Sequence, residues 1–183
     1  MPAPEEAEAQ RLFFALWPDE TTRRQVADLV DSLPRRQGRA TPVANLHVTL
    51  AFVGRTSPGG RLCLEHAASE VQGQPFTLHL DRVGYFARRR ILWLGPSETP
   101  LASADLAADL QRRLAPCGYE PERRAFRPHI TLMRKSRPPP EGLQPEPIDW
   151  RVEQFALVES VLSPAGAEYH VLRNFPLVSE DGT

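Results

Sequence analysis

The strongest constraint on this chain is a short string that occurs twice. Residues 47–50 read His-Val-Thr-Leu, and residues 129–132 read His-Ile-Thr-Leu. Side chains alternate between the two faces of a β-strand, so a strand at each string would present His and Thr on one face and the two apolar residues on the other. Because the strings are far apart in the sequence, we predict two similar halves that face each other across a cleft.

The composition is that of an ordinary globular protein. The chain has 183 residues, of which 41% are hydrophobic and 25% charged, enough for one domain that buries most of its apolar surface. A net charge of -1 provides no overall positive field, which argues against extensive duplex binding. Lys135 is the only lysine, and no Gly-rich loop precedes it, so neither a Walker-type phosphate site nor lysine-adduct chemistry is indicated.

The cysteines and the N-terminal segment carry no functional signal. Cys63 and Cys117 lack the spacing of a zinc site or a disulfide framework, so we expect both to be buried small apolar residues. Residues 1–10 are acidic and Ala-rich, and we expect them to be flexible. They lack the layout of a signal peptide, and no apolar run is long enough for a membrane span. We therefore expect a cytoplasmic protein without membrane contacts or a bound metal.

Hydrophobic periodicity predicts strands mixed with amphipathic helices, and hence an α+β fold. The predicted strands cover residues 11–17, 45–53, 76–86, 91–94, 128–133, 155–162 and 169–177. The predicted helices cover residues 18–33, 58–72 and 100–114, the second with an apolar stripe of Leu62, Leu64, Ala68 and Val71. Residues 76–94 are predicted to form a hairpin, and residues 137–147 a stiff, proline-rich surface loop. The order of strand, helix and His/Thr strand occurs twice, which suggests a loose duplication.

The paired motifs suit displacement at phosphorus. An imidazole with a pKa near ~6.5 can act as a base when neutral and as an acid when protonated. In-line displacement needs both roles, one at the attacking oxygen and one at the leaving oxygen. The Thr hydroxyls can donate to nonbridging oxygens, and an arginine can neutralise phosphate charge. A single His-x-Thr in a strand is commonly structural, but two copies in the same setting favour a catalytic site.

The surroundings of the motifs make the comparison more specific. The matching segments are residues 11–16, 45–54, 90–95 and 128–134, followed by Glu159, Ser160, Gly166, Tyr169 and Leu172. Together they cover nearly the whole chain. The sequence resembles the 2H phosphoesterase superfamily, and within it the RNA 2′,3′-cyclic phosphodiesterase branch, also called the 2′-5′ RNA ligase-like or LigT family.

The resemblance implies a fold and a set of roles. Residues 1–183 would form a single bilobal domain of two pseudo-symmetric α+β lobes, with antiparallel sheets lining a central cleft, helices outside and one motif in each lobe. His47 would donate a proton to the leaving ribose oxygen, and His129 would accept one from the attacking water. The phosphate would be held by Thr49, Thr131 and Arg134.

Two site residues need further argument from the pattern. Arg134 has the opposite strand parity to His129, so it reaches the cleft only if the strand ends or bulges there. Phe13 is a candidate for stacking a nucleobase because it lies opposite the core set of its strand, and the alternative is burial by the other lobe. The remaining histidines, His66, His79 and His170, are expected at the surface or periphery, outside the site. Trp93 is expected in the core.

The leading hypothesis is hydrolysis of a terminal ribose 2′,3′-cyclic phosphate to a 2′-phosphate, independent of metal and without a cofactor. The expected substrates are RNA or oligonucleotide ends that carry the cyclic phosphate, with small cyclic nucleotides as an alternative, and the expected state is a monomer. Two other hypotheses remain. One is reversible 2′-5′ joining of RNA ends in the same site. The other is a noncatalytic RNA-end binder that uses Phe13 and the arginine turn at residues 88–90.

Overall fold

Strands dominate the computed structural model, which describes residues 8–34 and 38–179. Most of the segment expected to be flexible, residues 1–7, lies outside the described residues, and Gln10 already begins the first strand. The strands are β1 (Gln10–Leu16), β2 (Arg39–Ala40), β3 (Val48–Thr56), β4 (Phe76–Leu80), β5 (Arg82–Phe86), β6 (Ile91–Gly95), β7 (Ile130–Arg134), β8 (Ile148–Val152), β9 (Gln154–Ser163) and β10 (Gly166–Pro176). The helices are α2 (Glu20–Ser32), α3 (Pro58–Ser69) and α4 (Leu101–Leu114), with 3-10 turns η2 (Val43–Asn45) and η3 (Ala115–Cys117).

Eight strands form one antiparallel sheet whose two halves meet at a single residue pair. The order is β10-β9-β1-β3-β7-β6-β5, with β2 paired to β7. At the junction between β3 and β7, Val48 pairs with Ile130. From this junction outward, one half reads β3, β1, β9 and the other reads β7, β6, β5. The predicted separate sheets are therefore halves of one sheet, because the two motif strands touch.

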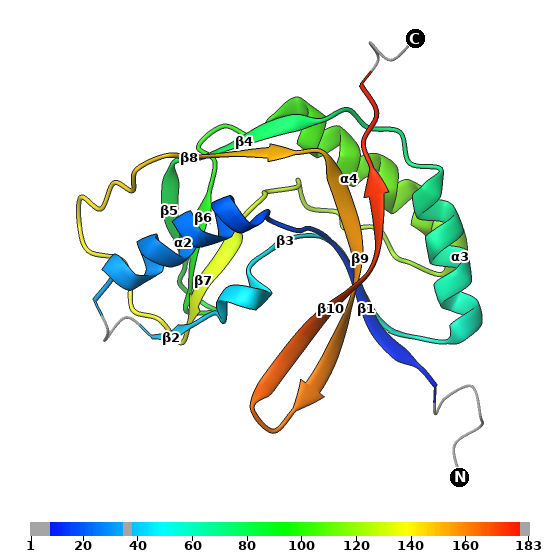
Figure 1. Cartoon of the computed structure of the whole chain (residues 1–183), viewed down its shortest axis with the longest axis horizontal. Helices are drawn as coiled ribbons and strands as arrows, with labels where there is room; N and C mark the ends of the chain where they lie inside the picture. The colour runs from blue at the N-terminus through cyan, green and yellow to red at the C-terminus, as the bar shows by residue number, and fades with distance from the viewer. Residues whose placement is uncertain (1–7, 35–37, 180–183) are drawn as a thin grey trace.

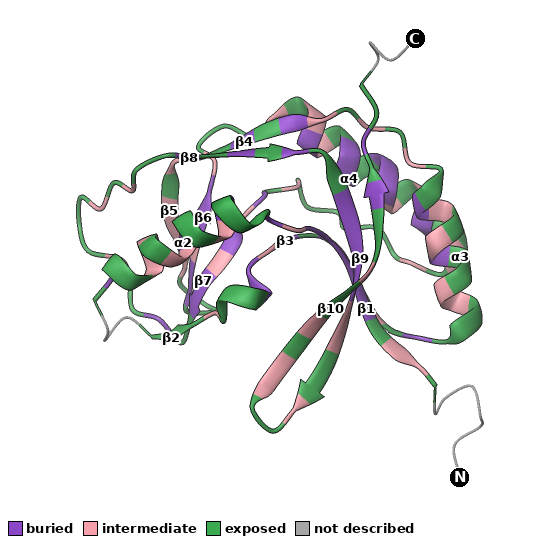
Figure 2. Cartoon of the chain, in the orientation of Figure 1, coloured by how far each residue is buried: buried purple, intermediate pink, exposed green. Residues whose placement is uncertain are grey.

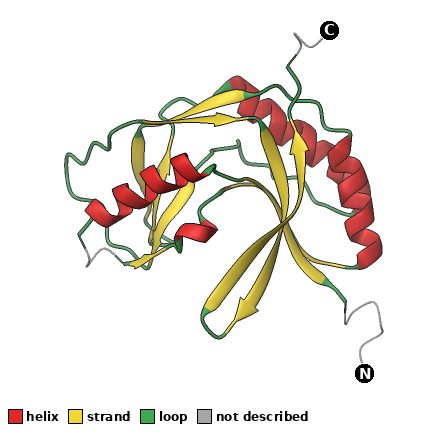
Figure 3. Cartoon of the chain, viewed as in Figure 1, coloured by secondary structure: helices red, strands yellow, loops and turns green. Residues whose placement is uncertain are grey.

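The helices cover the outside of this sheet, as Figures 1 and 3 show. Helices α3 and α4 pack against each other and α4 against β3, whereas α2 packs against β8. Helix α2 begins after Asp19, whose carboxylate accepts the Thr22 N–H at 2.8 Å. No helix in the described ranges combines the length and the apolar character that a membrane crossing requires. The predicted α+β class with antiparallel strands and external helices is confirmed.

The core follows the predicted strand periodicity more closely than the predicted helix periodicity. Leu12, Phe14 and Leu16 on β1 are fully buried, as predicted. Figure 2 shows buried stretches of the strands in purple. On α3, Leu64 and Ala68 are buried, but Leu62 is 69% exposed and does not belong to the core. The stripe was therefore wrong at Leu62, which faces solvent on the outer side of the helix.

The predicted strand over residues 76–86 is broken at Asp81 into β4 and β5. The Asp81 carboxylate accepts both the N–H and the hydroxyl of Ser97 at 2.7 Å, and its own N–H donates to the Gly95 carbonyl. This local network turns the chain, so β4 pairs with β8 in a second, two-stranded sheet. The predicted hairpin is confirmed for β5 and β6, whereas β8 was not predicted.

The expectation that both cysteines are buried apolar residues was wrong. Cys63 on α3 is exposed, and it forms a disulfide with Cys117 in η3. The pair closes a long segment of chain, and disulfides of this kind typically stabilise a fold by about 2–4 kcal/mol. Disulfides are rare in the cytosol, so this pair does not support the expected cytoplasmic location.

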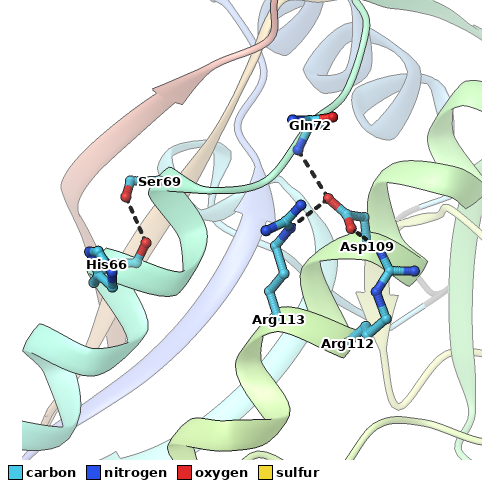
Figure 4. A network of polar contacts seen from close by, with 6 residues as sticks. All are labelled: His66, Ser69, Gln72, Asp109, Arg112 and Arg113. Atoms are coloured by element: carbon cyan, nitrogen blue, oxygen red, sulfur yellow. Dashed lines mark hydrogen bonds and ion pairs between the residues drawn. The ribbon is translucent and has the colours of Figure 1, made fainter.

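Asp109 on α4 joins that helix to the chain that leaves α3, as Figure 4 shows. Its carboxylate accepts the Gln72 N–H and the Arg113 Nε–H, both at 3.0 Å, and also pairs with Arg112. Burial alone would raise the pKa of Asp109, but the Gln72 N–H and the two arginines outweigh it, and the pKa is lowered. In the same view, Ser69 donates to the His66 carbonyl in the last turn of α3.

Replacing Asp109 with alanine should lower the free energy of unfolding at pH 7 by about 1–3 kcal/mol, because the Gln72 N–H loses its acceptor. The lowered pKa means that the carboxylate stabilises the fold above its unfolded-state pKa and loses this effect as the pH falls through its folded-state pKa. The difference from wild type should therefore shrink in acid. Urea unfolding measures both effects, with Asp105→Ala, an exposed position on the same helix, as control. Equal losses in the two variants would contradict the assignment.

Candidate active site

The β3–β7 junction brings the two His/Thr motifs together. Val48 and Ile130 pair directly, and both side chains are buried, at 1% and 0% exposure. Because neighbouring side chains point to opposite faces, the polar residues on either side of this pair share the other face. Continuing the antiparallel register sets the His of each motif opposite the Thr of the other. The four residues on this face are His47, Thr49, His129 and Thr131.

Backbone carbonyls fix the orientation of both imidazoles in the same way. His47 Nδ1 lies 2.7 Å from the Asn45 carbonyl oxygen, and His129 Nδ1 lies 2.8 Å from the Arg127 carbonyl oxygen. A carbonyl only accepts, so each Nδ1 carries a proton and each Nε2 is left to exchange protons with a ligand. In the substrate-free protein, His47 Nε2 accepts the Thr49 hydroxyl at 3.0 Å.

Three aromatic rings surround the His47 imidazole. Its centroid lies 5.0 Å from that of Phe13, 5.4 Å from that of Tyr169 and 5.9 Å from that of Trp17, with the Trp17 ring nearly parallel. Phe13 is only 4% exposed and packs with Val158 of β9. Its ring is therefore covered by its own half of the sheet, not by the other half, and it packs against the His47 ring. Sequence reasoning did not assign Trp17 or Tyr169 to the site, although Tyr169 belongs to the tail pattern that supported the family resemblance.

Two aromatic rings pack against the His129 imidazole. Phe86 and Trp93 lie edge-on to it, with centroids 5.2 and 6.2 Å away. Gly84 makes this possible, since a Cβ there would lie 2.0 Å from the Trp93 ring. Trp93 was predicted to be a core residue, but it is half-buried because its ring lies beside His129 at the edge of the core.

Burial and positive charge lower the pKa of the first histidine. Burial of the ring is the largest cause, and the charges of Arg134, Arg23 and His129 act in the same direction, so that the pKa of His47 falls to about 4. The hydrogen bond to the Asn45 carbonyl opposes this shift. Near neutral pH, His47 is therefore uncharged in the substrate-free protein.

The second histidine is shifted in the same direction. Burial lowers the pKa of His129, the Arg127 carbonyl opposes the shift, and the positive charge of Arg89 adds to it. Arginines thus stand near both imidazoles. A cleft with this excess of positive charge favours an anionic ligand, which would in turn stabilise the protonated imidazoles.

A bulge in β7 changes the direction of Arg134. Successive residues of β6 pair with Thr131 and Met133, which leaves Leu132 as an extra residue. Leu132 and Met133 are consequently both buried, and the exposed Arg134 returns to the face of Thr131. This is the kind of bulge that the parity argument required, and the charge of Arg134 acts on His47.

β3 contains the same bulge, and it reveals a residue that sequence reasoning missed. Successive residues of β1 pair with Thr49 and Ala51, which leaves Leu50 unpaired. Leu50 and Ala51 are both buried, and Phe52 returns to the cleft face with 55% of its surface exposed. The Arg11 guanidinium lies 5.5 Å from the Phe52 ring centroid. The sequence signal that could have identified Phe52 was its position, because Phe52 and Arg134 are each the third residue after a motif Thr.

Asn45 connects the β9–β10 hairpin to His47. Its buried side chain donates to the Ala167 carbonyl of β10 at 2.8 Å, and its own carbonyl accepts the His47 Nδ1–H. Two residues beyond Ala167, Tyr169 packs edge-on against the imidazole. One residue therefore sets both the orientation of His47 and the position of a ring that shields it.

The other histidines lie outside the cleft. His66, His79 and His170 are all exposed, as predicted. His79 is paired with Asp149 across β4 and β8, with 2.5 Å between Nδ1 and Oδ1. Across residues 8–34 and 38–179, no three His, Cys, Asp or Glu side chains are grouped so that they could hold a metal ion.

A comparison with known families agrees with this geometry. The sequence model of the 2′-5′ RNA ligase superfamily matches residues 17–163, a range that contains both motifs. The chain belongs to this superfamily.

Members of the superfamily with curated names are similar over nearly their full length. The RNA 2′,3′-cyclic phosphodiesterase of Escherichia coli is 33% identical over 176 residues, which cover 93% of this chain and 98% of that protein. The RNA 2′,3′-cyclic phosphodiesterase of Thermus thermophilus is 33% identical over 192 residues, covering 94% and 92%.

Solved structures agree with the fold. A crystal structure of a phosphoesterase superposes with a TM-score of 0.87 at 32% identity, covering 94% of this chain and 100% of that one. The crystal structure of E. coli LigT complexed with 3′-AMP superposes with a TM-score of 0.79 at 31% identity, covering 94% and 99%.

In this superfamily member, Asn45→Ala should raise the pKa of His47 towards the ordinary value of ~6.5, because β10 and Tyr169 lose their anchor and water reaches the ring. NMR titration of the His47 ring measures the shift. Asn174→Ala, an exposed position on β10, is the control and should leave this pKa unchanged. An unaltered His47 pKa in Asn45→Ala would show that the anchor does not shield the imidazole.

Proposed function

We propose that this protein hydrolyses a terminal ribose 2′,3′-cyclic phosphate on RNA to a 2′-phosphate, with His47 and His129 as acid and base. The observation that carries the proposal is the Val48–Ile130 pairing, which sets two His/Thr pairs face to face. The names of the relatives, RNA 2′,3′-cyclic phosphodiesterase, support the same substrate. The enzyme is thus a hydrolase that acts on a phosphoric diester bond.

In the proposed reaction, water attacks phosphorus and the bond from phosphorus to the ribose 3′ oxygen breaks. His129 Nε2 accepts a proton from the attacking water, and protonated His47 Nε2 donates one to the leaving 3′ oxygen. The product is a 2′-phosphate with a free 3′ hydroxyl, and each imidazole ends in the state opposite to that in which it began. The acid, the base and the charge stabilisation all come from side chains, so the mechanism uses no cofactor.

Hydroxyl groups and one guanidinium hold the phosphate in this mechanism. When His47 is protonated, its Nε2 no longer accepts from Thr49, and that hydroxyl becomes available to a nonbridging oxygen. Thr131 occupies the matching position in the other half. Arg134, turned to the cleft face by the bulge, supplies positive charge through a fork that suits phosphate oxygens.

In the proposed mechanism, binding of the substrate raises the pKa of His47. In the substrate-free protein, the low pKa of His47 favours the neutral ring, whereas a proton donor has to be protonated. The cyclic phosphate is an anion, and an anion next to an imidazole raises its pKa. Substrate binding therefore offsets the effect of the nearby arginines on the pKa of His47. His47 is then protonated in the complex, where it acts as the proton donor.

Phe52 is the better candidate for stacking the nucleobase. Phe13, chosen from the sequence, is 4% exposed and covered by Tyr169 and β9, whereas Phe52 is 55% exposed on the same face. Stacking of a base on an exposed aromatic ring contributes about 1–3 kcal/mol and tolerates every base. Such stacking suits RNA or oligonucleotide ends of varied sequence, and also small cyclic nucleotides, as substrates. A monomer and a cytoplasmic location stay predictions from the sequence.

The superfamily's description favours one further activity, reversible 2′-5′ joining of RNA ends in the same cleft. Joining uses a ribose 5′ hydroxyl in place of water, so both reactions need the same acid and base. A labelled pair of RNA ends separates them. Ligation faster than hydrolysis at dilute substrate would make joining the main activity.

His47→Ala and His129→Ala should each lower turnover by about two to four orders of magnitude, because a positioned acid or base is lost. Hydrolysis of a 2′,3′-cyclic mononucleotide in the presence of a chelator, with identification of the product isomer, is the assay. His66→Ala, on the exposed face of α3, is the control. Full activity in either cleft variant, or loss of wild-type activity with chelator, would overturn the proposal. Binding of cyclic-phosphate ends without turnover would point to a noncatalytic binder.

The rate should show a bell-shaped dependence on pH, with one acidic and one alkaline limb. The base works neutral, so activity is lost as pH falls through its pKa, and the acid works protonated, so activity is lost as pH rises through its pKa. Both cleft pKa values are lowered in the free protein, so the optimum of kcat/KM should lie below ~6.5. The pH profile of kcat reports the enzyme–substrate complex. Its alkaline limb should therefore lie at higher pH than that of kcat/KM, because the bound anion raises the pKa of the acid. Rates measured between about pH 4 and 9 test this, and a flat kcat/KM profile would contradict it.

A further inference from the structure

A groove of about 460 Å³ runs along the second part of β3, away from the catalytic histidines. One wall is the strand itself from Phe52 onward and the start of α3, and the other is the segment that follows α4. The lining residues that matter for binding are Phe52, Arg55, Ser57, Tyr119 and Glu120. The volume lies within the range of small-molecule sites, which begins near ~300 Å³.

The groove lies on an open strand edge. β1 pairs with one edge of β3, and on the other edge the described residues pair only at Val48. Gln111 of α4 ties the opposite wall to this edge, because its amide donates to the Leu50 carbonyl at 3.1 Å and accepts the Glu122 N–H at 2.9 Å. The separation of the two walls is therefore held by a defined contact.

Both walls lead back to the cleft. Phe52 is the third residue after Thr49, at most about 10 Å along an extended strand. The segment that begins at Tyr119 continues to His129. A cyclic phosphate occupies the 3′ end of an RNA, so the rest of the RNA leaves the cleft in one direction, on the 5′ side. Phe52 lies on the cleft face and also lines the groove, so the groove offers that exit.

The lining suits a nucleotide. Phe52 at the cleft end and Tyr119 on the opposite wall are aromatic, and stacking on such rings is how proteins hold single-stranded bases without reading their sequence. Arg55 and Glu120 offset each other in charge. A second hollow of about 340 Å³ follows at residues 120–124, where two glutamates balance the charges of Arg123 and Arg124, so it is the two aromatic rings that favour a nucleotide.

We propose that this groove binds the nucleotide on the 5′ side of the terminal one, with its base against Tyr119. The inference rests on the proposed function and extends it, because it makes the enzyme prefer a chain end to a mononucleotide. Phe52 holds the terminal base, and Tyr119 holds the one before it.

The experiment compares kcat/KM for two substrates, adenosine 2′,3′-cyclic phosphate and the adenosine dinucleotide with the same cyclic end. Wild type should favour the dinucleotide by about 5- to 150-fold, the range for stacking of one base. Tyr119→Ala should reduce this ratio to near one, whereas Tyr119→Phe, which keeps the ring, should retain it. Thermal unfolding of both variants checks that the fold is intact.

The outcomes separate the groove from the reaction. Turnover of the mononucleotide with no gain for the dinucleotide, or a gain that survives in a folded Tyr119→Ala, would overturn the groove assignment and leave the hydrolase standing. If wild type hydrolyses neither substrate, both proposals fail. A lost gain in Tyr119→Ala with rescue in Tyr119→Phe supports the groove.

Discussion

The pairing of Val48 with Ile130 is the contact on which the site depends. Both side chains are buried, and they join the two halves of the sheet where β3 and β7 meet. Because side chains alternate along a strand, burying this apolar pair turns the His and Thr of each motif to the other face. A slip of one residue in either strand would bury the polar set and expose the apolar one. The register that packs the core is therefore the same register that assembles the cleft.

The bulges at Leu50 and Leu132 complete the cleft. In each strand, the extra residue allows two consecutive apolar side chains to be buried and returns the third residue after the motif Thr to the cleft face. Regular alternation would have pointed Phe52 and Arg134 into the core. The motif thus provides more than an imidazole and a hydroxyl, because its Leu also redirects the strand that follows.

Local patterns in the sequence were enough for part of this structure. The repeated motif predicted two strands that each present His and Thr on one face, although it placed them in separate sheets, and the alternation in β1 predicted its buried face, because these patterns depend on neighbours along the chain. Other features depend on partners distant in sequence. Phe13 and Phe52 both lie on the cleft face, and only the packing of Tyr169 and Val158 decides that Phe13 is covered. The Cys63–Cys117 disulfide and the split at Asp81 likewise require the tertiary arrangement of α3 with η3 and of Asp81 with Ser97.

The cleft is alike in its two halves at the imidazoles but different at its ends. The matching third positions carry an aromatic ring in β3 and a guanidinium in β7, so a ligand with one aromatic end and one anionic end fits in a single direction. A nucleotide whose base stacks on Phe52 therefore points its phosphate towards Arg134. Along the strands, the antiparallel register puts Phe52 at the end of the cleft that holds His129 and Arg134 at the end that holds His47. The asymmetry of the ends, which the motifs themselves do not contain, thus sets the direction of the nucleotide, whereas the order of the two roles, His47 as donor and His129 as acceptor, is part of the proposed mechanism and follows from the family resemblance.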